Sequence, residues 1–270
     1  MVGAVEAGAV EAVVPYVSPG QSVTLYPSLT ASFQPGDERP VVIRNARAIA
    51  GLLDLEKNGF VLLNRPTALK DFSDPARIKD VYYPEIDALV KEITGASRVL
   101  IFAEIVRSED EGTPAHRRPG RFAHVDYDEP TVQRWVRGAV GTAEAERLLR
   151  HRHVLMNLWR PIATVERSPL AICDASTVER EDLNPLEART GPDDPNEATI
   201  RGFCLQHSPR HRWYYFPRMQ PDEILVFKLC DSEPDRVQWT AHTAFDDPTS
   251  PADAKPRRSI DLRTISFFEA

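Results

Sequence analysis

The spacing of hydrophobic residues, together with the glycine and proline residues at the ends of segments, predicts three helices. Residues 45–59 place apolar side chains three or four positions apart and end in Asn-Gly, which is typical of a helix C-terminus. Residues 84–94 begin with proline and are followed by Gly95, so both a start and a stop signal are present. We expect a third helix over residues 131–152. Helices of this kind need a sheet or another helix to cover their apolar side.

Short apolar runs separated by turn residues predict strands over most of the remaining chain. The expected strands cover residues 60–63, 99–106, 153–159, 170–174, 199–206, 212–216, 223–228, 238–243 and 259–268. Many short strands with turns between them indicate a sandwich or jelly roll, here with helices packed on one sheet of a two-sheet core. The predicted fold class is therefore α+β, mainly β with flanking helices.

Two internal segments without a period are expected to form mobile loops over the mouth of the core, residues 108–120 and 181–197. Such a cover would exclude water from a reactive site. Residues 1–20 are expected to be a frayed N-terminus. A chain of 270 residues can bury one sizeable core, so we expect a single domain over residues 1–270.

The strongest chemical signal comes from two short stretches more than a hundred residues apart. His124 and Asp126 are two positions apart, so on an extended strand both project from the same face. His242 would complete a set of two histidines and one carboxylate. This set leaves metal positions open and is typical of non-haem Fe(II) oxygenases rather than of closed structural zinc sites. We expect these three residues to be the metal ligands and the catalytic centre.

A second motif follows His242 near the C-terminus. On a strand, Arg257, Ser259, Asp261 and Arg263 share one face. A guanidinium and a hydroxyl on one face can bind a carboxylate, because arginine gives a two-pronged charged hydrogen bond and serine a further contact. Arg257 and Ser259 are therefore predicted to bind the distal carboxylate of 2-oxoglutarate, with Arg263 as the rival of Arg257.

Three more residues are candidates for contact with the cosubstrate or the substrate. On a strand, Asn157 and Trp159 share one face and Arg160 the other, so all three line one pocket only if the strand has a bulge. Asn157 and Arg160 both stay candidates, whereas Trp159 is expected in the core. Tyr214 and Tyr215 point to opposite faces, and Tyr214 is the candidate hydroxyl donor to the cosubstrate.

Other histidines and carboxylates are interpreted as structural. His207 and His211 have the spacing of a helical zinc pair, but Pro209 between them opposes a helix. His151 and His153 have no carboxylate at a useful spacing. Three acidic residues compete with the carboxylate of the triad and are expected in supporting roles: Asp128, Asp246 and Asp247.

These motifs, taken in order, resemble the hydroxylase/desaturase family, which includes fungal gibberellin desaturase and proteins related to the cephamycin methoxylase subunit. The resemblance runs from about Phe60 to the C-terminus and rests on HVDYD from His124, NLWRP from Asn157, WYYFP from Trp213, FKLCDS from Phe227, HTAFDDP from His242 and RRSI from Arg257. It implies a double-stranded β-helix, or cupin-like jelly roll, over residues 60–268. It also implies oxidation that depends on Fe(II), 2-oxoglutarate and O2, with a small-molecule substrate from secondary metabolism.

Charge and composition exclude several partners. The net charge of −7, without a dense run of Lys and Arg, opposes nucleic-acid binding. No apolar run approaches the ~20 residues that cross a bilayer, and the N-terminal segment lacks the basic start of a secretory signal. We therefore expect a cytoplasmic protein, whose assembly into a homo-oligomer stays open. Three cysteines without CxxC spacing are expected to be small buried residues: Cys173, Cys204 and Cys230.

Three alternative functions stay open at this point. The triad could serve an iron oxidase that draws its electrons from the substrate and needs no 2-oxoglutarate, and a different role for Arg257 would favour this. Zinc or manganese on a cupin-like barrel would instead indicate hydrolysis or isomerisation. A non-catalytic accessory subunit is the third alternative. No motif distinguishes hydroxylation from desaturation.

Overall fold

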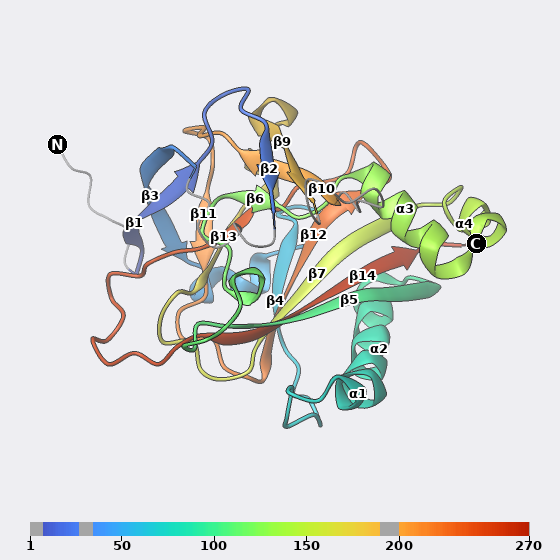
Figure 1. The fold of residues 1–270 in the computed structure, drawn as a ribbon, viewed down its shortest axis with the longest axis horizontal. Helices are drawn as coiled ribbons and strands as arrows, with labels where there is room; N and C mark the ends of the chain where they lie inside the picture. The colour runs from blue at the N-terminus through green and yellow to red at the C-terminus, as the bar shows by residue number, and fades with distance from the viewer. Residues whose placement is uncertain (1–7, 27–34, 190–199, 270) are drawn as a thin grey trace.

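Two β-sheets face each other and enclose the main hydrophobic core (Figure 1). The computed structural model describes residues 8–26, 35–189 and 200–269. Within them, the larger sheet has nine strands in the order β1 (Val10–Tyr16), β3 (Asp37–Asn45), β11 (Trp213–Tyr215), β8 (Leu170–Cys173), β13 (His242–Ala244), β6 (His124–Val125), β10 (Ile200–Leu205), β9 (Leu183–Ala188) and β2 (Val23–Leu25). The smaller sheet has five, in the order β4 (Phe60–Asn64), β12 (Glu223–Asp231), β7 (His153–Pro161), β14 (Arg258–Phe267) and β5 (Arg98–Ser108). Most neighbouring strands are antiparallel and come from distant parts of the sequence, which confirms the predicted jelly roll.

Side chains on β7 and β14 alternate between the core that lies between the sheets and the outer side of the smaller sheet. Trp159 of β7 belongs to the main core between the sheets, whereas Met156 and Leu158 face a second apolar cluster on the outer side. The register of β7 with β14 places Asn157 opposite Arg263. One face of this sheet therefore carries polar residues of the interior, and the other face is mainly apolar.

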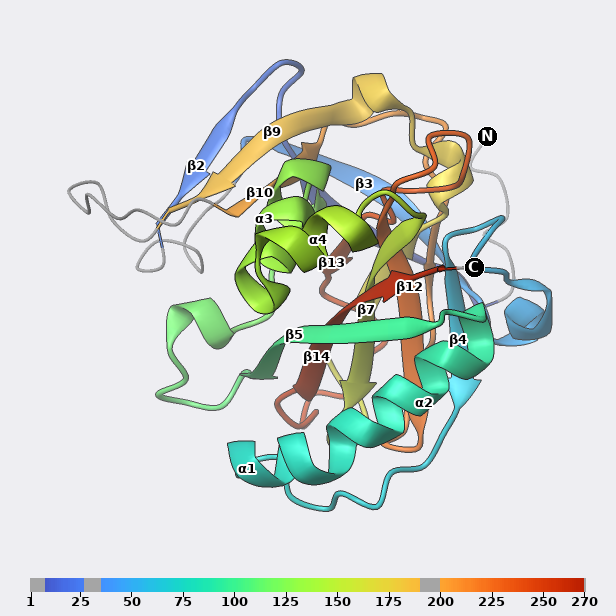
Figure 2. The same ribbon diagram turned by 90° about the vertical axis from the view of Figure 1, so that its right-hand side faces the viewer.

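Helix α2 (Tyr83–Thr94) covers that outer surface and confirms the helix predicted at 84–94 (Figure 2). Its residues Ile86 and Val90 are buried in the outer apolar cluster with residues of β7, β12 and β14. The helix ends at Gly95, whose φ of 73° gives the left-handed cap that glycine favours. Two short elements that the sequence did not predict precede it: α1 (Pro75–Arg77) and η2 (Ile78–Tyr82).

The helix predicted over residues 131–152 is instead two helices, α3 (Glu129–Val140) and α4 (Thr142–Leu148). Gly141 lies between them with a φ of 80°, which interrupts the helical geometry. The carboxylate of Asp128 caps α3 by accepting a backbone N–H of its first turn at 2.9 Å, so this residue is structural, as expected. Of the helices that the structure describes, none has the length and apolar composition needed to cross a membrane.

The prediction of a helix over residues 45–59 is wrong. A short 3-10 helix, η1 (Arg47–Leu52), forms there, and none of its residues is buried; Leu52 is 79% exposed. The carbonyl of Asp54 then accepts three backbone N–H groups and closes a turn that ends at Gly59, with a φ of 83°. The other apolar residues are only partly buried against the core, so the segment lacks the continuous buried face that supports a longer helix.

The expected fraying of the N-terminus is wrong for residues 10–16. They form β1, which pairs along its whole length with β3 and buries alternate side chains. β1, β2 and β3 all belong to the larger sheet, so the jelly-roll core begins before residue 60. The predicted boundary failed because the partner of β1, residues 37–45, was not recognised as a strand. Residues 1–7 lie outside the described part of the chain.

Two other predicted boundaries change. Residues 183–188, expected within a loop, form β9 because they pair with β10 on one side and β2 on the other. The rest of that expected loop, from residue 190 onward, lies outside the described residues. The strand predicted at 238–243 begins only at His242, since Trp239 adopts the left-handed conformation with a φ of 59°.

We predict that Gly202→Ala lowers the free energy of unfolding by about 1–3 kcal/mol, because the added methyl has no space. A Cβ at Gly202 would lie 2.3 Å from the carbonyl oxygen of Val125 and 2.5 Å from that of Asp126, on the neighbouring strand. Urea unfolding measures the change. Gly138→Ala is the control: its Cβ would meet nothing within 4 Å on α3, and alanine favours a helix. Equal stability of the two variants would contradict the prediction.

Candidate functional site

Two paired strands place two histidine rings side by side. His124 of β6 pairs directly with His242 of β13. Nδ1 of His124 lies 2.8 Å from the carbonyl oxygen of Phe122, and Nδ1 of His242 lies 3.3 Å from that of Thr240. A carbonyl only accepts hydrogen bonds, so each Nδ1 carries the proton and each Nε2 keeps a free lone pair. Both rings thus present the tautomer that can bind a metal through Nε2.

Asp126 completes the cluster. Its Oδ1 lies 3.6 Å from Nε2 of His124, and its Oδ2 lies 3.7 Å from Nε2 of His242. The possible ligand atoms of the three residues all lie within 4.8 Å of one another. The fold therefore brings together the two histidines and the carboxylate that the sequence proposed. Two imidazoles and one carboxylate on one side of a site are the donor set of non-haem Fe(II) centres.

The charges around the cluster set its protonation state. Burial raises the pKa of Asp126, but Arg263 and the two histidines outweigh burial and hold that pKa well below its usual range. Burial, together with His124, lowers the pKa of His242 to about 4, although Asp126 acts in the opposite direction. At neutral pH Asp126 is ionised and His242 is neutral, and both can donate an electron pair to a metal.

Two residues of the smaller sheet support the carboxylate. Nη2 of Arg263 lies 3.4 Å from Oδ1 of Asp126, and its guanidinium lies 5.2 Å from the centre of the Tyr127 ring. Nδ2 of Asn157 donates a hydrogen bond of 3.5 Å to Oδ2 of Asp126. Arg263 is thus engaged with Asp126, and Arg257 stays the candidate for binding the cosubstrate. Asn157, one of the two candidates that the sequence left open on this strand, lies at the site.

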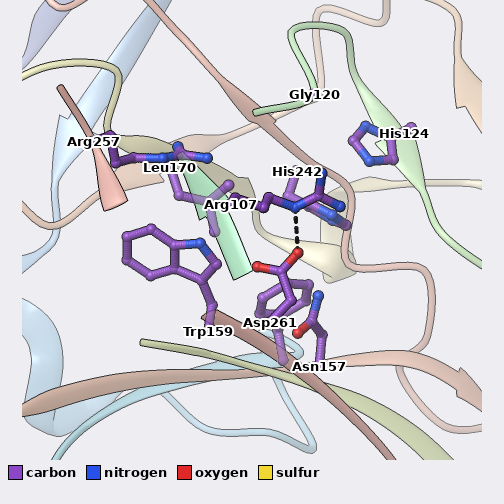
Figure 3. Close-up of a pocket in the computed structure, with 10 residues that line it drawn as sticks. Arg107, Gly120, His124, Asn157, Trp159, Leu170, His242, Arg257 and Asp261 are labelled. Atoms are coloured by element: carbon purple, nitrogen blue, oxygen red, sulfur yellow. Dashed lines mark hydrogen bonds and ion pairs between the residues drawn. The ribbon is translucent and has the colours of Figure 1, made fainter. Parts of the chain in front are cut away.

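A pocket extends from the histidines to Arg257 (Figure 3). His124 lies at one end, while Arg257 lies at the other with its guanidinium 5.5 Å from the ring centre of Trp159. The pocket therefore has a candidate metal-binding end and a cationic end. Its lining residues are Arg107, Gly120, His124, Asn157, Trp159, Leu170, Phe227, His242, Arg257 and Asp261.

Buried polar atoms at the cationic end lack partners. Nη1 of Arg257 donates to the carbonyl of Ser168 at 2.7 Å, but its Nε has no hydrogen-bond partner among the described residues. Ser259, two residues further along the chain, is not among the residues that line the pocket, but its buried Oγ is equally without a partner among the described residues. Burial lowers the pKa of Arg257 to about 10, so the guanidinium stays charged at neutral pH. Because buried donors are normally satisfied, these residues fit a ligand carboxylate such as that of 2-oxoglutarate.

Known proteins match almost the whole chain. The family model described as "Oxidoreductase/YMDC permease-like domain" matches residues 16–267. The alpha-ketoglutarate-dependent dioxygenase phiK of a fungal species is 32% identical over 97% of this chain and 98% of that protein. The hydroxylase/desaturase efuI of Hormonema carpetanum is 31% identical over 86% of this chain and 84% of that protein. The chain belongs to the Fe(II)/2-oxoglutarate-dependent dioxygenases.

A solved structure agrees with this membership. The iron and alpha-ketoglutarate-dependent endoperoxidase NvfI superposes with a TM-score of 0.87 at 27% identity, over 97% of this chain and 99% of that one. Enzymes of this family need Fe(II), 2-oxoglutarate and O2, and the chain is accordingly a non-haem iron oxidoreductase. The hydrolase and accessory-subunit alternatives have no support among these relatives.

Sequence reasoning missed an ion pair in the wall of the dioxygenase pocket. Nε of Arg107 donates to the carboxylate of Asp261, and Nη1 of Arg107 donates to the carbonyl of Arg118 at 2.9 Å (Figure 3). Asp261 lies on the predicted face of β14, but Arg107 comes from β5, where it pairs in register with Ser259. Only the pairing of these two strands reveals Arg107. Trp159, expected in the core, also lines the pocket.

Two predicted contacts are not part of the pocket. Arg160 points to the outer side of β7, where its guanidinium donates to the hydroxyl of Tyr82 and to the carbonyls of Pro221 and Arg65. Its candidate role at the cosubstrate is therefore wrong, because β7 alternates without a bulge at this point. Tyr214 packs against Phe60, with ring centres 6.1 Å apart, and does not line the pocket.

The remaining histidines are structural, as expected. His211 lies 3.2 Å from the carboxylate of Asp182 and stacks on the Tyr16 ring, which His207 also contacts. Nε2 of His153 lies 2.8 Å from the carboxylate of Glu129. The three cysteines are buried and unpaired, also as expected: Cys173, Cys204 and Cys230.

We predict that His242→Ala weakens Fe(II) binding by at least about 100-fold, beyond the ~10–100-fold typical of a group that only orients a ligand. The reason is that one of three clustered ligand atoms is removed. Anaerobic equilibrium dialysis with Fe(II) measures the affinity. His151→Ala is the matched control, because this exposed histidine lies outside the cluster and its loss should leave iron binding unchanged. Similar iron affinity in both variants would exclude His242 as a ligand.

Proposed function

We propose that this dioxygenase holds Fe(II) with His124, Asp126 and His242, and that Arg257 and Ser259 bind the distal carboxylate of 2-oxoglutarate. The observation that carries the proposal is the single pocket that joins the histidine cluster to Arg257. The unpartnered Nε of Arg257 and Oγ of Ser259 supply the two donors that a carboxylate needs. The metal-binding end and the cationic end thus correspond to the two ends of one cosubstrate.

When bound, iron and 2-oxoglutarate supply an oxidant strong enough to remove hydrogen from a carbon atom. The residues of the chain hold and enclose these groups. Asp126 contributes a negative charge, which Arg263 stabilises with its Nη2 3.4 Å from Oδ1 of the carboxylate. Trp159, Leu170 and Phe227 line the pocket with apolar surface and so limit the access of water.

The substrate that we propose is a small molecule of secondary metabolism, which is hydroxylated or desaturated. Relatives named hydroxylase/desaturase support this reaction class, while the NvfI structure is titled an endoperoxidase. Proteins with this fold are therefore named for more than one kind of oxidation. The placement of the substrate carbon decides among them, because a displacement of about 1 Å is enough to change reactivity. Three free, buried thiols support our proposal that the enzyme works in the reducing cytoplasm.

We predict that anaerobic addition of Fe(II) and then 2-oxoglutarate produces the weak visible charge-transfer band of a keto acid bound to iron. Arg257→Ala should weaken 2-oxoglutarate binding by about 10–100-fold, the effect of losing a charged hydrogen bond to a carboxylate. Titration of the band against 2-oxoglutarate gives the affinity in each variant.

Arg258→Ala is the matched control for this titration. Arg258 is the next residue along the strand, but its side chain is 56% exposed and pairs with Asp110 at 2.7 Å. It should bind 2-oxoglutarate as the wild type does. Iron binding without any band in the wild type would contradict the proposed use of 2-oxoglutarate and favour an oxidase that draws electrons from its substrate.

A further inference from the structure

The guanidinium of Arg257 is held by a protein carbonyl rather than by a protein carboxylate. Its Nη1 donates to the carbonyl of Ser168 at 2.7 Å, and its Cζ lies 5.5 Å from the ring centre of Trp159. The side chain is buried, and its Nε has no partner among the described residues. The direction in which Arg257 presents its free N–H groups therefore depends on the position of the Ser168 carbonyl.

Ser168 adopts a backbone conformation that its surroundings must maintain. Its φ of 50° lies in the left-handed region, which side chains other than glycine rarely adopt without support. Two groups contact its hydroxyl: Oγ donates to Oε1 of Glu109 at 2.7 Å, and Nη2 of Arg121 donates to Oγ at 2.6 Å. Ser168 is thus oriented from outside the pocket, by Glu109 and Arg121.

Glu109 also contacts the main chain of the anchor itself. Its Oε2 accepts the backbone N–H of Arg257 at 3.1 Å, and its own backbone N–H donates to the carbonyl of Arg257 at 3.0 Å. Arg121 and Arg167 neutralise the carboxylate at 3.0 Å and 3.3 Å. Burial raises the pKa of Glu109, but the hydroxyl of Ser168 and the N–H of Arg257 outweigh burial and lower it overall, so the carboxylate is ionised at neutral pH.

We propose that Glu109 is the positioning residue of the cosubstrate anchor, and that it sets the affinity for 2-oxoglutarate without touching it. One carboxylate holds both the backbone of Arg257 and the residue whose carbonyl orients the guanidinium. Glu109 lies just after the end of β5 and outside the residues that line the pocket, so its action is indirect. This inference rests on the proposed role of Arg257.

The test is Glu109→Gln, which keeps the shape of the side chain but replaces one acceptor oxygen by a donor. We expect anaerobic 2-oxoglutarate affinity, read from the charge-transfer band, to fall about tenfold, as for the loss of a group that orients a ligand-binding residue. Fe(II) affinity should not change. Affinity for pyruvate, which has the keto acid end but no distal carboxylate, should also be unchanged.

Two further variants separate positioning from a general structural effect. Ser168→Ala removes the hydroxyl that contacts Glu109 and Arg121 but keeps the contact of Glu109 with the backbone of Arg257. It should cause a smaller loss of 2-oxoglutarate affinity, and it carries the test if Glu109→Gln does not fold. Asp246→Asn is the control, because Asp246 pairs with the same Arg121 but its side chain is 89% exposed. It should bind 2-oxoglutarate as the wild type does.

A double-mutant cycle gives the sharpest result. If Glu109 acts through Arg257, then Glu109→Gln adds no further loss in an Arg257→Ala background. Additive losses, or an equal loss of pyruvate and 2-oxoglutarate binding, would overturn the inference. A wild-type band together with unchanged binding by Glu109→Gln would overturn this inference alone. Absence of a band in the wild type would overturn the proposed function as well.

Discussion

The buried negative charge of Asp126 is the constraint on which the rest of the site depends. Transfer of a carboxylate out of water costs several kcal/mol of free energy unless cations and hydrogen-bond donors surround it. Here Arg263 comes from β14, Asn157 from β7, and the two histidines from β6 and β13. Residues of both sheets must therefore meet around one side chain, and the same arrangement forms the candidate metal site and the pocket beside it.

Local patterns predicted the parts of the site that a single strand specifies. The spacing of His124 and Asp126 brings them together, and the spacing of Arg257, just before β14, and Asp261, within it, brings both to one pocket. Arg107 was not predictable, because its place in the wall depends on the pairing of β5 with β14, which no local pattern contains. For the same reason the pairing of β1 with β3 was not predicted, so the core was expected to begin at a later residue than it does.

Another failure arose where tertiary packing supports a local pattern only in part. The apolar spacing of residues 45–59 resembled a helix, yet Leu52 projects into solvent and the segment folds as a turn of 3-10 helix. Arg160 is a failure of a different kind. Its motif is close to that of Asn157, but strict alternation directs the two side chains to opposite sides of β7. Closeness in the sequence therefore added Arg160 to the predicted site, although its side chain lies on the other side of the strand.

The hydrogen-bonding capacity of the pocket places a further constraint on what can occupy it. 2-Oxoglutarate carries only acceptor oxygens at neutral pH, so it can satisfy the unpartnered Nε of Arg257 and Oγ of Ser259. Oδ1 of Asp261 is also buried without a partner among the described residues, and it is itself an acceptor. A second carboxylate cannot satisfy it. Its partner must be a donor, from water or from another occupant of the pocket, so 2-oxoglutarate alone does not satisfy every buried polar atom there.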